Sequence, residues 1–372
     1  MYRLNESLRG VRVLDLSRYL PGPLATLLLA DLGAEVLKVE PPAGDEMRRL
    51  GPRDAAGQPV FFDAINAGKS SCRMDLKQPQ VRERFLALAK DADVLVESFR
   101  PGVAKRLGVG YDELSRINPG IVYCAMSGYG MNGPLAQAAG HDANYLALAG
   151  VLDRNGDEHP AYYDPPMADT AGALFAVIAI QAALAARARD GRGCEIDLGL
   201  CDALAPLQTF QIADYGARGA SPHRAETYLN GGAACYRVYR TSDARHVVVG
   251  AIDETFWVRF CNAAGRPQWI ARAWEPMPQR ALIGEVQALF ATMTLAQCIE
   301  RFEPVDCCVT PALTLAEAAQ SPQWQARELV RRSPAGQLQA LFPARVNGHP
   351  PPSRPPARER AEWRPRPGRV GS

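Results

Sequence analysis

The sequence predicts an α/β protein with a Rossmann-like, doubly wound large domain and a smaller α+β domain. Short apolar runs alternate with helical stretches through the first half of the chain, which is typical of a parallel sheet covered by helices on both faces. Later the order changes to a strand pair followed by several helices. The length of 372 residues accommodates two domains, and a composition of 47% hydrophobic and 22% charged residues is that of an ordinary globular protein.

The large domain opens with a βαβ pattern. Residues 11–16 form a short apolar strand, and the Pro-Gly-Pro at 21–23 turns the chain into a helix with leucines at helical spacing. Gly33 ends this helix, and residues 34–39 form the next strand. We expect a right-handed crossover between these two parallel strands.

Further elements continue the alternation. Residues 94–96, 121–125 and 194–198 are predicted strands, and residues 80–90, 111–117, 170–189 and 199–212 are predicted helices. The fingerprint G-x-G-x-x-G is absent after the first strand, where SRYLPGP stands instead. Glu40, at the end of the second strand, matches the position of a ribose-binding acid, but without the glycines it supports no dinucleotide site.

Residues 213–232 shift to Gly, Arg, Ser and Asn without clear periodicity, so we expect a linker there. A small domain follows over residues 233–314, and residues 1–212 and 315–372 form the large one. The predicted strands of the small domain are residues 236–241, 247–251 and 308–310, and its predicted helices are residues 254–263, 280–292 and 295–302. The chain then returns to the large domain through a predicted helix at 315–320. The Pro- and Arg-rich tail, residues 350–369, is expected to be extended or disordered.

Composition argues against several classes of protein. A net charge of +2 gives no bulk attraction to nucleic acid. Nine cysteines without a C-x-x-C pair indicate a reduced, cytoplasmic protein. The N-terminus is polar, and the longest apolar run, residues 171–186, is too short for a membrane span. The five histidines show no metal-binding spacing, so we expect no metal site.

Residues 127–150, SGYGMNGPLAQAAGHDANYLALAG, contain the first catalytic candidate. Three glycines and a proline predict a loop in which backbone can approach a ligand closely. His141 lies where this loop meets an expected helix, a place suited to an acid or base near neutral pH, although a structural histidine is the alternative. Asp169, Asp253 and Glu254 are further candidates, for which helix capping is the alternative.

Basic residues follow several predicted strands, where open α/β sheets bind ligands. They are Lys38, Arg48, Arg49, Arg73, Lys77, Arg100, Lys105 and Arg106. Each one alone is more often a solvated surface charge, but as a set they favour a phosphorylated ligand.

Together these residues resemble a family III CoA-transferase of the CaiB/BaiF type, the family that includes α-methylacyl-CoA racemase. The resemblance rests on six segments: LRGVRVLDLSRYLPGPLATLLLADLGAEVLKVEPPAGD, RMDLK, VLVESFRPGVAKRLGVGYDEL, SGYGMNGP, GRGCEIDLGLCDAL and VDCCVTPALTLAEA. It implies a CoA thioester substrate, no metal or nicotinamide, and an interlocked homodimer with active sites between subunits. It also implies CoA phosphates near Lys77, Arg100 and Arg106, with the adenine near Met74 or Phe99; Lys38 is a further candidate contact.

Within the resemblance, two chemistries are open. Transferases use an aspartate nucleophile, and Asp169 in MADTAG matches it. Racemases use a histidine, supported by that aspartate, in a segment similar to the GHDANY containing His141. Their opposing glutamate stands in GAIEPQF, where this chain has GAIDETF, so Asp253 or Glu254 is the expected second base.

We therefore expect racemisation of a 2-methylacyl-CoA by 1,1-proton transfer through an enolate. Backbone amides at the start of the Asp169 helix are expected to hold the enolate oxygen. CoA transfer through an aspartyl anhydride is the alternative, and a non-catalytic CoA-binding protein is a third.

Overall fold

The computed structural model describes residues 3–360 and Trp363. The chain divides into two compact units. The first comprises the described residues of 1–149, 164–207 and 322–372, and the second comprises residues 150–163 and 208–321. The domain boundaries expected from the sequence stay a prediction about how the chain is organised.

A seven-stranded sheet forms the centre of the first unit, in the order β12-β3-β2-β1-β4-β5-β6. Every neighbouring pair is parallel. The strands are β1 (Arg12–Leu16), β2 (Glu35–Glu40), β3 (Ser70–Arg73), β4 (Val94–Glu97), β5 (Val122–Ser127), β6 (Cys194–Gly199) and β12 (Arg358–Glu359). The first six strands thus lie in the order 3-2-1-4-5-6, which is that of doubly wound nucleotide-binding sheets. The central parallel sheet predicted from the sequence is confirmed.

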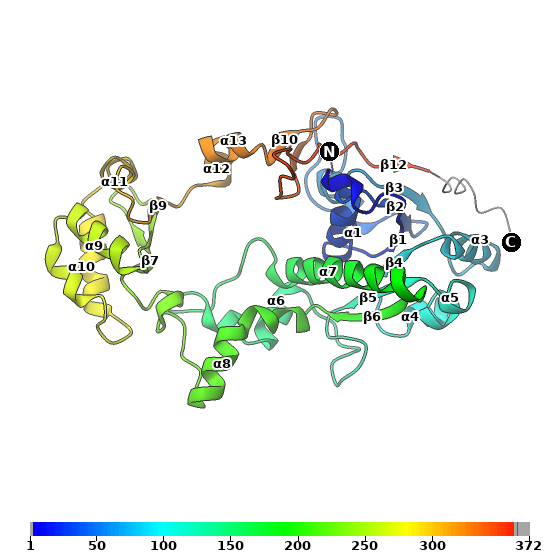
Figure 1. Cartoon of the computed structure of the whole chain (residues 1–372), viewed down its shortest axis with the longest axis horizontal. Helices are drawn as coiled ribbons and strands as arrows, with labels where there is room; N and C mark the ends of the chain where they lie inside the picture. The colour runs from blue at the N-terminus through cyan, green and yellow to red at the C-terminus, as the bar shows by residue number, and fades with distance from the viewer. Residues whose placement is uncertain (1–2, 361–362, 364–372) are drawn as a thin grey trace. The chain divides into compact units, whose positions relative to one another are not determined.

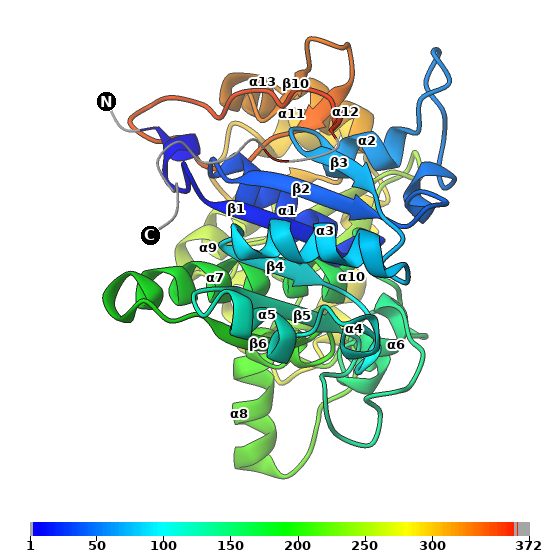
Figure 2. The same cartoon turned by 90° about the vertical axis from the view of Figure 1, so that its right-hand side faces the viewer.

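Helices cover both faces of this sheet (Figures 1 and 2). On one face, α1 (Pro21–Asp31) and α7 (Met167–Asp190) pack against each other and against the strands, and α3 (Pro79–Lys90) and α5 (Tyr111–Ile117) lie over the other. Alternate residues of β1 explain the two layers, since Leu14 and Leu16 pack with Phe85 of α3 and Leu114 of α5. The helices of this unit are α1 (Pro21–Asp31), α2 (Val60–Asn66), α3 (Pro79–Lys90), α4 (Val103–Leu107), α5 (Tyr111–Ile117), α6 (Asp142–Leu148), α7 (Met167–Asp190) and α13 (Pro322–Arg327).

Two sheet strands and one hairpin are absent from the sequence prediction. The sequence of β3, SSCR, has no apolar run, and β12 lies in the Pro- and Arg-rich tail. The hairpin of β10 (Val330–Arg332) and β11 (Leu338–Ala340) is also short. Strands this short and polar form only because a neighbouring strand completes their hydrogen bonds, which a local pattern does not reveal.

Residues 350–360 of the tail are extended, which is the first of the two forms expected from the sequence. Arg354 donates two hydrogen bonds of 2.6 Å to Asp31 at the end of α1, and both side chains are buried. Gln339 on β11 hydrogen-bonds the backbone of Arg354 from both ends of its amide. The rest of the tail, except the buried Trp363, lies outside the described residues.

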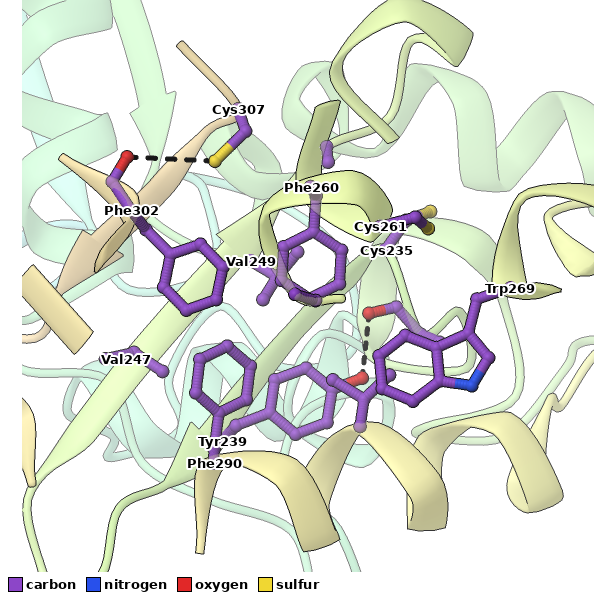
Figure 3. Packing of buried hydrophobic residues seen from close by; sticks show 14 of the residues in the cluster. Cys235, Tyr239, Val247, Val249, Phe260, Cys261, Trp269, Phe290, Phe302 and Cys307 are labelled. Carbon is purple, nitrogen blue, oxygen red and sulfur yellow. Dashed lines mark hydrogen bonds between the residues drawn. The ribbon is translucent and has the colours of Figure 1, made fainter. Parts of the chain in front are cut away.

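The second unit contains an antiparallel sheet in the order β7-β8-β9, with β7 (Tyr236–Arg240), β8 (His246–Gly250) and β9 (Val309–Pro311). Its helices are α8 (Thr209–Arg218), α9 (Glu254–Ala263), α10 (Arg280–Phe290), α11 (Leu295–Phe302) and α12 (Leu315–Gln320). Figure 3 shows the aromatic core, where Tyr239 stacks on Phe290, Phe290 on Phe260, and Phe260 on Phe302. The predicted helix at 199–212 was wrong, because β6 and two short 3-10 turns precede α8, which runs into the expected linker.

Helix α7 is longer than the sequence prediction. By length and composition alone, its 24 residues would suffice to cross a membrane. It packs against α1, β5 and β6, so it also meets the description of a core helix of a folded domain. Leu174 and Ile178 remain about half exposed on its other face.

Candidate active site

A cavity of about 750 Å³ opens at the carboxyl ends of β4 and β5 in the first unit. Doubly wound sheets bind their ligands at this edge. The segments after β1, β4 and β5 form its walls, and the starts of α6 and α7 close it. Its lining includes His141, Asp169, Arg18, Tyr19, Phe99 and Arg100.

The glycines of residues 127–140 make room for Tyr145. A Cβ on Gly128 would lie 2.6 Å from the Tyr145 hydroxyl, and one on Gly140 would lie 2.8 Å from its ring. The Tyr145 hydroxyl donates to the Gly140 carbonyl at 2.6 Å. Gly128 is thus needed for side-chain packing, whereas Gly130 has the positive φ, 83°, that a tight turn requires.

His141 is the residue that precedes α6. Its backbone N–H donates to the Asn144 side chain at 3.0 Å, which fixes the turn into the helix. Its ring packs edge to face with Tyr19 at a centroid distance of 6.3 Å. Tyr19 has a φ of 59°, a conformation that non-glycine residues rarely adopt. The segment GHDANY therefore sets the position of one imidazole on the cavity wall.

Asp169 lies in the first turn of α7 but does not cap it. The cap is Asp142, whose carboxylate accepts the backbone N–H groups of Ala168 at 2.7 Å and Asp169 at 3.1 Å. The capping interpretation of Asp169 is therefore wrong. Burial, together with the charge of Asp142, raises the pKa of Asp169 to about 6. The two amides expected to hold an enolate oxygen are occupied by Asp142, so that expectation is also corrected.

His141 and Asp169 line one cavity, as the sequence predicted for two groups acting on one substrate. No hydrogen bond joins their side chains in the described part of the chain. Asp169 lies instead close enough to Tyr145 to help raise the pKa of that phenol to about 12, after the larger effect of burial. The imidazole of His141 and the carboxyl of Asp169 therefore line the same cavity without bonding each other.

Asp253 and Glu254 belong to the second unit, at the start of α9. Asp253 occupies the capping position, but its side chain makes no capping hydrogen bond. Both side chains are exposed. The expected alternative role as a side-chain cap is therefore wrong for Asp253.

The predicted CoA contacts separate into three groups. Lys77, Phe99 and Arg100 line the first cavity, while Met74, Lys77 and Phe99 line an adjoining cavity of about 320 Å³. The guanidinium of Arg18 lies 5.5 Å from the centre of the Phe99 ring, a cation–π contact between the two cavities. Arg106 is exposed on α4 and lines neither of them.

The expectation that Lys38 contacts CoA is wrong. Its side chain is 1% exposed, and its ammonium group bonds Asp45 and the Ser17 carbonyl, each at 2.9 Å. Lys38 is not among the residues that line the two cavities described above, so a direct contact with CoA is not expected. The charge of Lys38 is used to hold the segment after β1.

The carboxylate of Glu40 is already hydrogen-bonded within the protein. Its carboxylate accepts two hydrogen bonds of 2.7 Å from Arg48 and one of 2.9 Å from the Asp45 amide. Burial is the largest single effect on the pKa of Glu40 and raises it, but the hydrogen bonds and the charge of Arg48 together outweigh burial, so the pKa is lowered. An acid paired in this way does not offer its oxygens to a ribose, which agrees with the missing glycine fingerprint.

The sequence analysis missed a buried ionic cluster formed by Asp15, Thr26 and Lys69. Lys69 bonds Asp15 at 3.2 Å and Thr26 at 2.8 Å, and the side chains of the ionic pair are fully buried. Asp15 also accepts the backbone N–H of Ser17 at 2.9 Å, next to Arg18 and Tyr19. Burial lowers the pKa of Lys69 to about 8, partly countered by Asp15. The only local signal is a charge inside an apolar strand, VLDL.

Comparison with known proteins agrees with this architecture. A model of CoA-transferase family III matches residues 8–368. The chain is 32% identical to acetyl-CoA:oxalate CoA-transferase of Acetobacter aceti, over 91% of this chain and 89% of that protein. It is 35% identical to human α-methylacyl-CoA racemase, over 84% and 79% of the two chains. The crystal structure of a CaiB/BaiF family protein from Brucella suis superposes with a TM-score of 0.83 at 30% identity, covering 94% and 96%. This chain is an enzyme that belongs to CoA-transferase family III.

Proposed function

We propose that the enzyme racemises a 2-methylacyl-CoA thioester by removing and returning the α-proton. The observation that carries this proposal is that the imidazole of His141 and the carboxyl of Asp169 line one cavity at the carboxyl edge of the sheet. An imidazole can take or give a proton near neutral pH. The segment GHDANY around it is similar to that of racemases rather than to a general feature of the family.

In this mechanism His141 exchanges the α-proton on one face of the substrate. Asp169, with a pKa raised to about 6 by burial and Asp142, is a stronger base than an ordinary carboxylate and holds a proton more readily. The similarity to racemases makes Asp253 or Glu254 the candidate second base; both side chains are exposed, and Asp253 makes no capping hydrogen bond. A 2-methylacyl group is the acyl group to be tested first.

The CoA portion extends from the first cavity into the second. Lys77 and Arg100 offer positive charge to the diphosphate, and Met74 and Phe99 offer apolar surface to the adenine. Lys77 and Phe99 line both cavities, which supports one continuous ligand path. CoA is substrate in this proposal, and no prosthetic group is invoked.

CoA transfer between carboxylic acids is the second candidate. The absence of a hydrogen bond between His141 and Asp169 favours it, because an uncommitted carboxylate suits a nucleophile. The similarity to acetyl-CoA:oxalate CoA-transferase also supports it.

Incubation with (2R)- and (2S)-2-methylacyl-CoA in deuterated water tests the proposal. Deuterium at the α-carbon with loss of stereochemical purity is expected. The same reactions with added acetate, succinate or oxalate test the alternative, in which CoA appears on the added acid. Transfer without α-exchange would overturn the racemase proposal in favour of the transferase.

We further propose that the active enzyme is a homodimer. Half-exposed Leu174 and Ile178 on α7, and exposed Phe210, Ile212 and Tyr215 on α8, support association, since monomers rarely leave so many large apolar side chains in water. Family membership supports the interlocked form.

A further inference from the structure

We propose that Tyr19 is a positioning residue, whose ring holds the imidazole of His141 in the orientation needed for proton transfer. This inference rests on the proposed function, in which His141 exchanges the α-proton. Both residues line the first cavity, although they come from distant segments: Tyr19 lies between β1 and α1, and His141 precedes α6. Both side chains are exposed, so neither ring is fixed by burial in the core.

The imidazole of His141 has one aromatic neighbour. In the part of the chain that the structure describes, only Tyr19 makes a ring contact with it, at a centroid distance of 6.3 Å and an interplanar angle of 87°. Aromatic pairs prefer this edge-to-face arrangement over a face-to-face sandwich. An exposed side chain samples several rotamers, and the contact favours the one in which the imidazole lies against the Tyr19 ring.

The backbone of Tyr19 has a conformation that favours glycine. Its φ is 59°, in the left-handed region, where a residue with a side chain is strained unless its surroundings impose the conformation. Glycine would adopt this φ without strain but would have no ring to offer His141. A tyrosine at such a position indicates that its side chain has a function.

Buried polar groups fix the backbone that precedes Tyr19. Asp15 on β1 accepts the backbone N–H of Ser17 at 2.9 Å and also its hydroxyl. The ammonium group of Lys38 on β2 donates to the Ser17 carbonyl at 2.9 Å. The next backbone N–H along the chain donates to the hydroxyl of Ser98, which follows β4, at 2.9 Å. Contacts from three neighbouring strands thus impose the course of the chain at Tyr19 and set the direction of its ring.

A ring fixed in this way restricts where the imidazole can lie during proton transfer. A displacement of about 1 Å from the productive geometry can cost about a hundredfold in rate. Removing the ring should therefore slow the step that uses His141. It should affect substrate binding little, because Lys77 and Arg100, the proposed contacts of the diphosphate, are unchanged.

Three variants separate the ring of Tyr19 from its backbone. Tyr19→Phe keeps the ring, Tyr19→Ala removes it at the same strained φ, and Tyr19→Gly removes it and relieves the strain. Thermal unfolding should therefore give a higher midpoint for the glycine variant than for the alanine variant. Tyr162→Ala changes an exposed tyrosine outside the lining of the cavity and is the matched control.

Exchange of the α-proton into deuterated water, followed for each enantiomer of a 2-methylacyl-CoA, measures the catalytic effect. Tyr19→Ala and Tyr19→Gly should lower kcat about 10-fold to 100-fold for the enantiomer that depends on His141, with KM changed by less than about twofold. Exchange of the other enantiomer should stay near the wild-type rate. Tyr19→Phe and Tyr162→Ala should resemble wild type for both.

NMR of the enzyme with ¹³C-labelled histidine follows the imidazole itself, without any substrate. The signal of His141 is assigned as the one that is missing in His141→Ala. It should shift in Tyr19→Ala and Tyr19→Gly, which lack the neighbouring ring, and stay close to its wild-type position in Tyr19→Phe.

An unshifted His141 signal in both variants that lack the ring would overturn the positioning role of Tyr19. So would equal losses for the two enantiomers, or a Tyr19→Phe variant as slow as Tyr19→Gly. In each of these cases, wild-type exchange that is lost in His141→Ala leaves the proposed function standing. Wild-type enzyme that exchanges the α-proton of neither enantiomer would instead overturn the proposed function, and the role of Tyr19 in proton transfer with it.

Discussion

The carboxylate of Asp142 accepts the backbone N–H of Asp169 at 3.1 Å. This contact joins the residue that follows His141 to the first turn of α7. The start of α6, which carries His141, is thereby bonded to the start of α7, which carries Asp169. The charge of Asp142 adds to the effect of burial in raising the pKa of Asp169.

Asp142→Asn should separate these two effects. The amide oxygen can still accept the helix N–H groups, but the negative charge is gone, so the pKa of Asp169 falls below its value of about 6. If ionised Asp169 is required, the acid limb of the kcat/KM profile should move to lower pH by less than about one unit. Asp142→Ala is the comparison, and should lose about 1 kcal/mol of stability with the cap. An unmoved acid limb in Asp142→Asn would contradict the proposed coupling.

Asp169→Asn should stabilise the fold at pH 7. A carboxyl whose folded pKa is raised binds protons more tightly in the folded than in the unfolded state, so its ionisation disfavours folding as pH rises from about 4 to 6. The gain at pH 7 should be on the order of 2 kcal/mol and should vanish below about pH 4. Urea unfolding at the two pH values measures it. A gain that persists at low pH would point to packing rather than to charge.

His141→Ala should abolish α-proton exchange from one enantiomer, with a loss of about 100-fold to 10,000-fold. Asp253→Asn or Glu254→Gln should do the same for the other enantiomer, whichever is the second base. Exchange into deuterated water, followed separately for each enantiomer, reads this out. His159→Ala, at an exposed position, is the control. Unchanged exchange of both enantiomers in His141→Ala would remove the racemase assignment.

Lys69→Met should be strongly destabilising, by about 3–5 kcal/mol, because it leaves Asp15 charged and without its buried partner. Combining it with Asp15→Asn should recover part of the loss. The same change at exposed Lys77 should cost little stability but weaken CoA binding. Chemical denaturation compares the three, and similar midpoints for the Lys69 and Lys77 variants would refute the structural role of the buried pair.

Sedimentation at micromolar concentration should show a dimer that does not dissociate on dilution, since threaded chains separate only after unfolding. Chemical unfolding should then show a midpoint that depends on protein concentration. Detection of a folded, active monomer would exclude the interlocked arrangement.

Local sequence patterns were enough to predict the parts of the fold in which apolar periodicity and burial agree. The apolar runs of β1, β2, β4 and β5 were recognisable because these strands are buried on both faces. The periodicity of α3, α5 and α11 was recognisable because each helix buries one face. His141 and Asp169 could also be singled out from residue type and surroundings.

Which charged groups remain available to a ligand depends on contacts between distant parts of the chain. Lys38 and Arg100 are both basic residues near strand ends, but Lys38 is buried against Asp45, whereas Arg100 lines the cavity. Likewise β3 and β12 exist because distant strands complete their hydrogen bonds, and the cap of α7 comes from Asp142, 27 residues before Asp169. Burial and pairing depend on residues far apart in sequence, so no local pattern contains them.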